Sequence, residues 1–411
     1  MKIKDLKAIQ ILDSRGNPTV RTILTLEDNS SHSSSVPSGA STGSYEAVEL
    51  RDEDKSKYLG KGVLAAVNNV NTKIKDAIIN KEADPNTIDD IMLTLDGTDN
   101  KANLGANAIL SVSQAVVKAA AHIENKPLWQ FMNEYYFKDK KPSFPKLLVN
   151  IVNGGKHANW NFDIQEFMVV PNTNIPSESV RIAAEIFHSL GKILKDKKLS
   201  TLLGDEGGYS PNLSSNEEVL DIIIQAAKNA GYENNRDYRL SLDVAATEWY
   251  ENDKYISHKS NRQISVEDLI KYFKTITDKY SLLSIEDPLS EDDWENYVKM
   301  TKEINTTIIG DDLFVTNPKR IGRGIKEKAG NAVLIKVNQI GTIKETAEAI
   351  NMTHNAGWKT AISHRSGETE DSFIADLSYA CASEFIKTGS MSRSERLSKY
   401  NRLLEIEEGI K

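Results

Sequence analysis

The chain has 411 residues, with 51 basic and 59 acidic side chains and a net charge of −8. This length exceeds what one hydrophobic core usually supports, so a barrel of ordinary size with a second, smaller domain is expected. The acidic balance argues against a nucleic-acid-binding protein, and no apolar run approaches the length of a membrane span. An anionic substrate would therefore have to be attracted by local positive charge or by a metal ion.

The single cysteine, Cys381, excludes an intrachain disulfide and gives no sign of an oxidising compartment. The first seven residues, Met1 to Lys7, lack the apolar stretch of a signal peptide. We therefore expect a cytoplasmic protein.

The N-terminal part of the chain predicts an α+β domain. Two β-rich runs, Ile3 to Leu12 and Thr19 to Leu26, are separated by the turn-forming segment Asp13 to Pro18, which predicts a hairpin. Helical periodicity follows in three segments, at about Val63 to Asn80, Thr87 to Leu95 and Gly105 to Ile123.

A domain boundary is expected near Asn125 to Lys146, where charge and proline interrupt the periodicity. We place the first domain at residues 1–132 and the second at residues 140–411. Beyond the boundary, short apolar runs alternate with amphipathic stretches to about Glu408, as in a β/α barrel.

Six ionisable residues in the second domain each close a short apolar run: Asp243, Glu286, Asp311, Lys336, His364 and Lys387. The steps between neighbours are 43, 25, 25, 28 and 23 residues. All but the first step fit one strand, one helix and two short loops. In a closed barrel, parallel strands bring such residues to a single mouth.

One carboxylate after an apolar run is weak evidence, because it is more often a helix N-cap or a solvated strand end. Six charged groups at matching depth are harder to explain in this way, since burying charge is costly unless it is paired or coordinated to metal. Three carboxylates, followed by two lysines around a histidine, indicate a metal site facing a basic anion site. The P-loop, the dinucleotide-binding fingerprint and the zinc motifs are missing from the sequence.

Loop segments carry a second, weaker signal. Residues 37–43, Pro-Ser-Gly-Ala-Ser-Thr-Gly, could bring Ser41 close to a phosphate or a cation. Residues 153–157, which end at His157, fit a mobile lid or an ordinary turn, and Glu166 closes another apolar run. Glu206 lies among glycines, where the backbone can approach a ligand. Each of these loops also fits a plain surface turn.

The chain resembles the enolase family over essentially its whole length. The similar segments are residues 13–20, 37–43, 104–109, 165–168, 204–208, 284–288, 310–313, 336–341, 363–371 and 386–389, which include Gly-Asp-Glu-Gly-Gly at 204–208 and Ser-His-Arg-Ser-Gly-Glu-Thr at 363–369. The resemblance implies a C-terminal β/α (TIM-like) barrel that carries the active site, and a smaller α+β capping domain with a three-stranded sheet. It also implies a lyase that reversibly dehydrates 2-phosphoglycerate to phosphoenolpyruvate in glycolysis and gluconeogenesis.

The resemblance further implies two Mg²⁺ ions per active site. Asp243, Glu286 and Asp311 would hold the first ion, and the second would arrive with the substrate and contact Ser41. Oxygen ligands of this kind suit magnesium.

The same resemblance assigns roles in catalysis and in substrate binding. Lys336 would be the base that removes the C2 proton, and Glu206 the acid that helps the C3 hydroxyl group leave, with Glu166 and His157 contributing. The substrate would be bound by Gln165, His364, Arg365, Ser366, Lys387 and Ser41. Whether Lys336 is neutral at working pH stays open, because metal and Lys387 would lower its pKa while the carboxylates would raise it.

Two other functions stay open: abstraction of an α-proton from a different carboxylate by a barrel of the same superfamily, and a structural or binding role without catalysis. The phosphate ligands Arg365, Ser366 and Ser41 argue against the first, and the complete set of site residues argues against the second. Glycines at 39, 43, 154, 155, 207 and 208 predict loops that close over the substrate. By resemblance, we expect a homodimer or a larger assembly of dimers, with no membrane or nucleic-acid partner, although family members also occur at cell surfaces.

Overall fold

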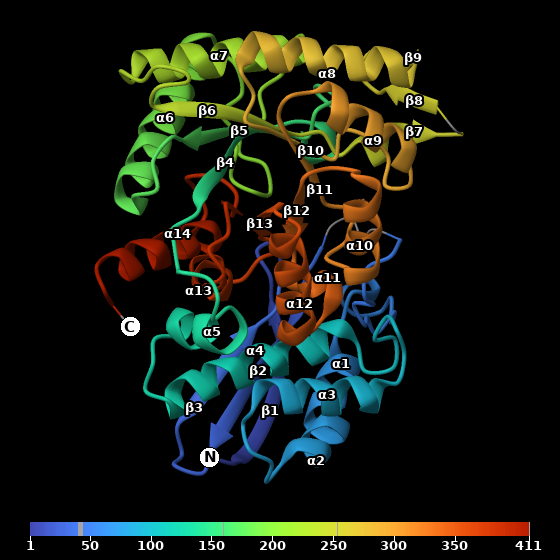
Figure 1. Ribbon diagram of the computed structural model, residues 1–411, viewed down its shortest axis with the longest axis vertical. Helices are drawn as coiled ribbons and strands as arrows, with labels where there is room; N and C mark the ends of the chain where they lie inside the picture. Colours follow the sequence, from blue (N-terminus) through green and yellow to red (C-terminus); the bar gives the residue numbers. More distant parts are fainter. Residues whose placement is uncertain (40–43, 159, 253, 411) are drawn as a thin grey trace.

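The computed structural model describes residues 1–39, 44–158, 160–252 and 254–410, with the side chains of His157 and Ala158 outside this description. Figure 1 shows an N-terminal domain, in blue, beneath a barrel formed by the rest of the chain. In these described ranges, no helix combines the length and the apolar character needed to cross a membrane.

The N-terminal domain is built on an antiparallel sheet of β1 (Ile3–Leu12), β2 (Pro18–Leu26) and β3 (Ser31–Ser35). The turn between β1 and β2 is held by Asp13, whose Oδ1 accepts hydrogen bonds from the backbone N–H of Arg15 at 2.9 Å and of Asn17 at 2.8 Å. The predicted hairpin is therefore confirmed. Helix α4 (Ala106–Ile123), which is buried along most of its length, packs on β2 and β3 and also contacts the barrel.

The other N-terminal helices largely follow the predicted pattern. The segment expected at Val63 to Asn80 is one helical run, made of α1 (Leu64–Asn69), the π-helical η2 (Val70–Ile74) and α2 (Lys75–Ile78). A short 3-10 turn, η1 (Tyr58–Gly60), precedes it, and α3 (Pro85–Asp96) follows it. However, α5 (Leu128–Tyr136) lies inside the expected boundary segment, because buried Phe131 and Met132 give this short stretch an apolar face.

The closed barrel has the strand order β10-β11-β12-β13-β14-β4-β5-β6. Its strands are β4 (Lys146–Asn153), β5 (Glu166–Pro171), β6 (Tyr238–Asp243), β10 (Ser284–Glu286), β11 (Thr307–Gly310), β12 (Ala332–Ile335), β13 (Lys359–Ser363) and β14 (Phe385–Lys387). The expected β/α barrel is confirmed, but the expectation of parallel strands is wrong for β5, which is antiparallel to both β4 and β6. No crossover helix separates β4 from β5, where the structure describes only the short turn η3 (Gly155–Ala158), and parallel pairing would need such a crossover.

Helices surround the barrel (Figure 1). They are α6 (Pro176–Asp196), α7 (Asn216–Asn229), α8 (Val266–Tyr280), α9 (Trp294–Glu303), α10 (Pro318–Glu327), α11 (Val337–Ile340), α12 (Ile343–Asn355), α13 (Phe373–Ala380) and α14 (Ser394–Glu407). The long step of 43 residues from Asp243 to Glu286 contains an additional small sheet of β7 (Tyr250–Glu251), β8 (Lys254–Ser257) and β9 (Arg262–Ile264), preceded by the turn η4 (Ala246–Trp249). This insertion explains why that step alone does not fit one helix and two loops.

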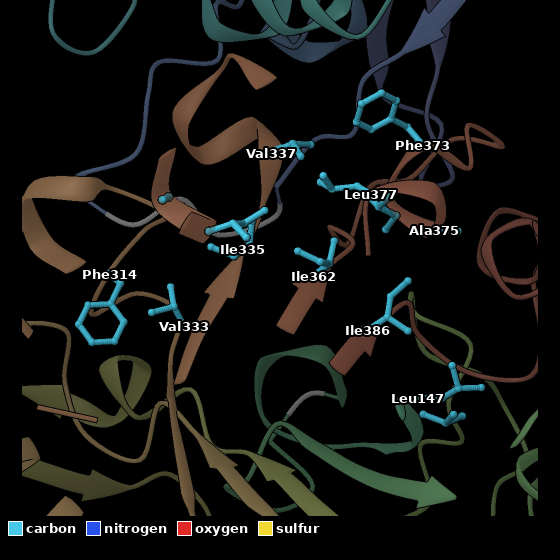
Figure 2. Close-up of a cluster of buried hydrophobic side chains, with 14 of the residues drawn as sticks. Leu147, Phe314, Val333, Ile335, Val337, Ile362, Phe373, Ala375, Leu377 and Ile386 are labelled. Carbon is cyan, nitrogen blue, oxygen red and sulfur yellow. The ribbon is translucent and has the colours of Figure 1, made fainter. Parts of the chain in front are cut away.

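Apolar side chains alternate between two faces of the barrel strands. Val333 and Ile335 belong to the large core between the strands and the surrounding helices, and Figure 2 shows them with Ile362. Ala332 and Leu334 belong instead to a smaller cluster inside the barrel. Since strand side chains point to opposite faces in turn, the position of a residue relative to these clusters tells which way its side chain faces.

Candidate active site

The alternation of the strands carries polar side chains into the interior at one end of the barrel. Lys336 comes two residues after inward-facing Leu334, and Lys387 comes two residues after inward-facing Phe385. Five of the six run-end residues have this inward position: Asp243, Glu286, Asp311, Lys336 and Lys387. The sequence spacing therefore identified one cluster of charge at the carboxyl end of the barrel strands.

His364 is the exception among the six. Strand β13 ends at Ser363. His364 comes two residues after Ile362, whose side chain faces the helices, so continued alternation would turn His364 toward the helices as well. Both Ser363 and His364 nevertheless line the cavity at the barrel mouth, and both are buried. Sequence reasoning missed Ser363, although two-residue alternation from Ala361 would have indicated it.

Glu166 reaches the same mouth because its strand runs the other way. It is the first residue of β5 and pairs with Asp243 on one side and with Asn153 on the other. The interpretation of Glu166 as the end of an apolar run is therefore wrong, since the antiparallel direction of β5 puts its beginning at the mouth. Gln165 precedes it and has its Nε2 3.5 Å from Asp243 Oδ2.

Lys387 lies at the centre of the carboxylates. Its buried ammonium group is 2.8 Å from Asp243 Oδ2, 2.9 Å from Glu286 Oε1 and 3.3 Å from Glu166 Oε2. Burial lowers the pKa of Lys387, but the surrounding carboxylates outweigh burial and raise it well above its ordinary value. Burial and the neighbouring Glu206 raise the pKa of Glu166 well above its usual range, which favours a proton on this carboxyl group.

Lys336 is paired at the mouth with Asp311, which follows the neighbouring strand β11. Asp311 also accepts a hydrogen bond at 2.9 Å from Nε2 of Gln339. Burial acts to lower the pKa of Lys336, but the carboxylates of Asp311, Asp312 and Glu46 together outweigh it and raise the pKa. The sequence left open whether Lys336 is neutral or charged. In this arrangement the raised pKa favours its ammonium form.

Glu206 is held on the opposite side of the mouth by a glycine-rich loop. Its Oε2 accepts a hydrogen bond at 3.1 Å from Asn150 Nδ2 and lies 3.7 Å from His364 Nε2. A Cβ atom at Gly208 would stand 2.6 Å from Asn153 Oδ1, so only glycine allows the loop to approach β4 this closely. The close approach explains why glycines surround Glu206.

Arg365 carries an ion pair that the sequence did not reveal. Its Nη1 is 2.8 Å from Glu46 Oε2 and its Nη2 is 3.2 Å from Glu46 Oε1, while Nη1 also donates to Asn338 Oδ1 at 3.0 Å. Glu46 belongs to the N-terminal domain, so this pair ties the two domains together at the mouth. The sequence feature that could have indicated Glu46 is its position just after residues 37–43, the segment that carries Ser41.

A cavity at the mouth is lined by ten of the residues that the sequence assigned to the site: Gln165, Glu166, Glu206, Asp243, Asp311, Lys336, His364, Arg365, Ser366 and Lys387. Glu286 is buried and hydrogen-bonded to Lys387. Ser41 lies outside the described residues, as does the side chain of His157, whose backbone is part of η3. The roles assigned to these two residues stay predictions, as do the roles of the residues that line the cavity.

A second acidic group overlaps the predicted metal ligands. Among the described residues, carboxylate oxygens of Asp287, Asp311 and Asp312 lie within 4.8 Å of one another. Asp287 is already engaged, since its Oδ1 accepts from Asp311 N at 2.9 Å and its Oδ2 from Asp312 N at 2.7 Å. Asp287 therefore holds the end of β11 in place, which makes it a poor ligand for a cation.

The donor set suits a hard divalent cation. Asp243, Glu286 and Asp311 offer buried carboxylate oxygens whose charge is compensated by Lys387 and Lys336, long side chains that can move. Mg²⁺ prefers oxygen ligands of this kind. These three residues consequently fit a magnesium site better than the Asp287 group does.

Comparison with known protein families gives two matches that together span nearly the whole chain. Residues 3–132 match the family model described as the enolase N-terminal domain. Residues 141–411 match the model described as the enolase C-terminal TIM barrel domain. The second match covers the strands and loops that build the mouth.

Proposed function

Because the chain belongs to the enolase family, we propose that it reversibly converts 2-phosphoglycerate to phosphoenolpyruvate and water with the help of Mg²⁺. The observation that carries the proposal is the placement of Lys336 and Glu206 in one buried cavity, with carboxylates and Arg365 around them. An elimination needs a base on one side of the substrate and an acid on the other. The cavity supplies both, together with a cation for a phosphate group.

The proposed metal ligands are Asp243, Glu286 and Asp311, and a second Mg²⁺ would enter with the substrate next to Ser41. When bound, the metal would supply positive charge that stabilises the negative charge building up on the substrate carboxylate. Lys387 would add a positive charge beside the same group. Before the substrate arrives, three carboxylates share this charge.

The proposed reaction uses Lys336 as base and Glu206 as acid. A neutral Lys336 takes the C2 proton, and the C2–H electrons are first delocalised onto the substrate carboxylate. They then form the C2–C3 double bond as the C3–O bond breaks and Glu206 gives its proton to the leaving hydroxyl group. Stabilising the charge in the transition state more than in the substrate is what accelerates such a step. Since Lys336 is an ammonium group while it is paired with Asp311, it must release a proton before it can act.

Phosphate recognition is proposed for Arg365 and Ser366. Arg365 presents a planar fork that suits a phosphate group, and Glu46 holds that fork in a fixed orientation. Gln165 and His364 would complete the substrate contacts, while Glu166 and His157 would assist near Glu206. A relative that acts on a carboxylate without phosphate would have no use for Arg365 in this position.

The test is to follow the ultraviolet absorbance of the conjugated product after mixing the purified chain with 2-phosphoglycerate. We expect a rise with Mg²⁺ that a chelator abolishes, and a loss of about 1,000-fold or more in kcat for Lys336→Ala. Lys359→Ala is the matched control, because Lys359 is an exposed residue at the opposite end of a neighbouring strand. Folded wild-type protein that produces no rise with Mg²⁺ would overturn the proposal.

A further inference from the structure

Helix α14 buries two cationic side chains on one face. Arg396 and Lys399 are both 0% exposed, although lysine and arginine are rarely buried completely unless they are paired. The two residues are three positions apart and therefore neighbours on the helix surface. Both point toward the segment that follows β13, which carries His364, Arg365 and Ser366.

Arg396 joins two loops of the proposed active site. Its Nη1 donates to Arg365 O at 2.6 Å and lies 2.7 Å from His364 Nδ1. Its Nη2 donates to Ser366 O at 2.6 Å and to Asp205 O at 3.2 Å. One guanidinium group thus links the loop after β13 to the loop that holds Glu206.

The contact with His364 determines where the imidazole proton lies. An arginine side chain can only donate hydrogen bonds, so Nδ1 of His364 must be the acceptor. A neutral imidazole then carries its hydrogen on Nε2. Burial lowers the pKa of His364 well below its ordinary value, against the opposing charge of Glu206 and with the charge of Arg396 adding to the effect, which keeps the ring neutral.

The Nε2–H group of this tautomer faces Glu206. Oε2 of Glu206 accepts a hydrogen bond from Asn150 and lies 3.7 Å from His364 Nε2. One N–H group thus bonds to Oε2 and a second lies beside it, and both favour negative charge over a proton on this oxygen. The opposite tautomer would present a lone pair to Oε2 and would favour a proton there.

Lys399 shows what a purely structural cation does in the same place. Its Nζ is bonded to Glu368 Oε2 at 2.8 Å and to Thr369 O at 2.6 Å, so its charge is neutralised by a carboxylate. The Nη atoms of Arg396 bond to carbonyl oxygens and a histidine nitrogen, and its nearest carboxylate oxygen, on Glu395, is 3.6 Å from Nε. A guanidinium group placed only for stability would be better paired with a carboxylate.

We propose that Arg396 is a positioning residue that fixes His364 as the Nε2–H tautomer and thereby keeps the acidic proton of Glu206 off Oε2. The part that concerns Glu206 rests on the proposed dehydration, whereas the tautomer does not depend on the reaction. Arg396 is not among the described residues that line the cavity at the mouth. It acts through His364 and through the backbone of the two loops.

The first experiment reads the tautomer directly in the wild-type chain. The seven histidines are labelled with ¹⁵N, and His364 is assigned by the signal that disappears in His364→Gln. We expect Nδ1 of His364 to resonate as a nitrogen without hydrogen and Nε2 as one that carries hydrogen. A hydrogen on Nδ1, or on both nitrogens, at neutral pH would overturn the proposal even if no Arg396 variant folds.

The second experiment compares two steps of the proposed reaction in Arg396→Lys. Loss of the C2 hydrogen to D₂O reports on Lys336, while product formation also requires Glu206. We expect dehydration to fall about 100-fold and C2 exchange to change much less, so that the ratio of exchange to dehydration rises. Equal losses in both rates would mean a merely structural role and would overturn the proposal.

The matched control is Arg402→Lys on the same helix. Arg402 forms a two-bond pair with Asp376, at 2.8 and 2.9 Å, away from the active-site loops. We expect this variant to keep both the wild-type ratio and the wild-type tautomer of His364. If the wild-type chain showed neither exchange nor dehydration, the proposed function would fail, while the tautomer measurement would still decide the position of the His364 proton.

Discussion

Two regions of this chain bury carboxylates to the same depth but give them different partners. At the barrel mouth, Glu286 is 1% exposed and is bonded to the side chain of Lys387. In the N-terminal domain, Asp96 is 2% exposed and accepts hydrogen bonds from the backbone N–H groups of Thr98, Asn103 and Leu104, at 3.1, 3.1 and 2.6 Å. Backbone groups are fixed by the fold, whereas a lysine side chain can swing away.

This difference in partners distinguishes carboxylates that can bind a ligand from carboxylates that only support the fold. A carboxylate that is satisfied by backbone amides gains nothing from a metal ion, because binding one would break those hydrogen bonds. A carboxylate that is compensated by a lysine side chain can exchange that partner for Mg²⁺ or a substrate. Burial alone therefore does not identify a catalytic carboxylate, and a lysine partner is informative only at the barrel mouth, because Lys399 neutralises buried Glu368 away from the cavity.

Replacing Lys387, the cation that the carboxylates at the barrel mouth could exchange for Mg²⁺, should have the largest effect on the free energy of unfolding. In Lys387→Met, three buried carboxylates lose their shared cation, and we expect the metal-free protein to lose about 4 kcal/mol of unfolding free energy. Mg²⁺ should restore part of that loss, since a cation that binds only the folded state stabilises it. The measurement is urea unfolding with and without Mg²⁺. Equal unfolding curves for the wild type and the variant without metal would contradict this prediction.

Removing a scaffold carboxylate should cost somewhat less, and metal should not reverse the loss. In Asp96→Ala, buried backbone N–H groups lose their acceptor, and we expect a loss of about 3 kcal/mol. Mg²⁺ should stabilise this variant by the same amount as the wild type, and the kcat of the folded protein should be unchanged. Asp99→Ala is the control, because Asp99 is exposed and forms only a surface ion pair with Lys319. Greater stabilisation of Asp96→Ala than of the wild type by Mg²⁺ would place Asp96 among the exchangeable carboxylates.

The pair between Glu46 and Arg365 lies between these two extremes. It is buried and connects the domains, yet its cation is the proposed phosphate ligand. In Glu46→Gln, the competing negative charge is removed while the hydrogen-bonding shape is kept, so inorganic phosphate should bind about ten-fold more tightly, or about 1.4 kcal/mol. Calorimetric titration with phosphate measures this effect. Glu49→Gln is the control, since Glu49 pairs with Arg51 in the same segment, and an equal gain in both variants would contradict a specific role for Glu46.

The sequence predicted the parts of the molecule that depend on local pattern. Apolar runs of strand length, each closed by a charged residue, were enough to predict a barrel with Asp243, Glu286 and Lys387 at one end. The direction of β5 was not predictable from its own residues, because a fully buried strand has the same apolar pattern in either direction. A local sign was the short connection between β4 and β5, in which the described residues form no crossover helix.

The supporting residues of the site could not be predicted in the same way. Glu46 and Arg396 reach the mouth from the N-terminal domain and from the last helix, more than 300 residues apart in sequence. Neither closes an apolar run, and each has the appearance of an ordinary surface charge. Their roles depend on long-range packing, which strand periodicity does not describe.

Asp89 gives the smallest and most specific test, because it is a scaffold carboxyl group with only part of its hydrogen bonding satisfied. Its Oδ2 accepts hydrogen bonds from Lys344 N and Ser113 Oγ, each at 3.0 Å, where α12 meets α3 and α4, while its Oδ1 has no hydrogen-bond partner among the described residues. Burial raises the pKa of Asp89 to about 7, with the nearby charges of Glu345 and Asp90 adding to it. The fold therefore holds this group in its neutral form.

The folded pKa of Asp89 lies above the unfolded value of 3.8, so the folded protein binds more protons than the unfolded chain between these two values. Stability from this group is complete at low pH and is lost as the pH rises toward 7. In Asp89→Asn this pH-dependent loss should disappear, because the side chain no longer titrates. Between about pH 5 and about pH 6, the unfolding free energy of the wild type should therefore fall by about 1 kcal/mol more than that of the variant. Urea unfolding of both proteins at each pH measures it, with Asp99→Asn as the control, because exposed Asp99 forms an ion pair with Lys319 at the surface. If the unfolding free energies of wild type and Asp89→Asn changed equally with pH, Asp89 would be ionised in the folded protein. Its two hydrogen bonds would then stabilise a charge, as the backbone amides around Asp96 do.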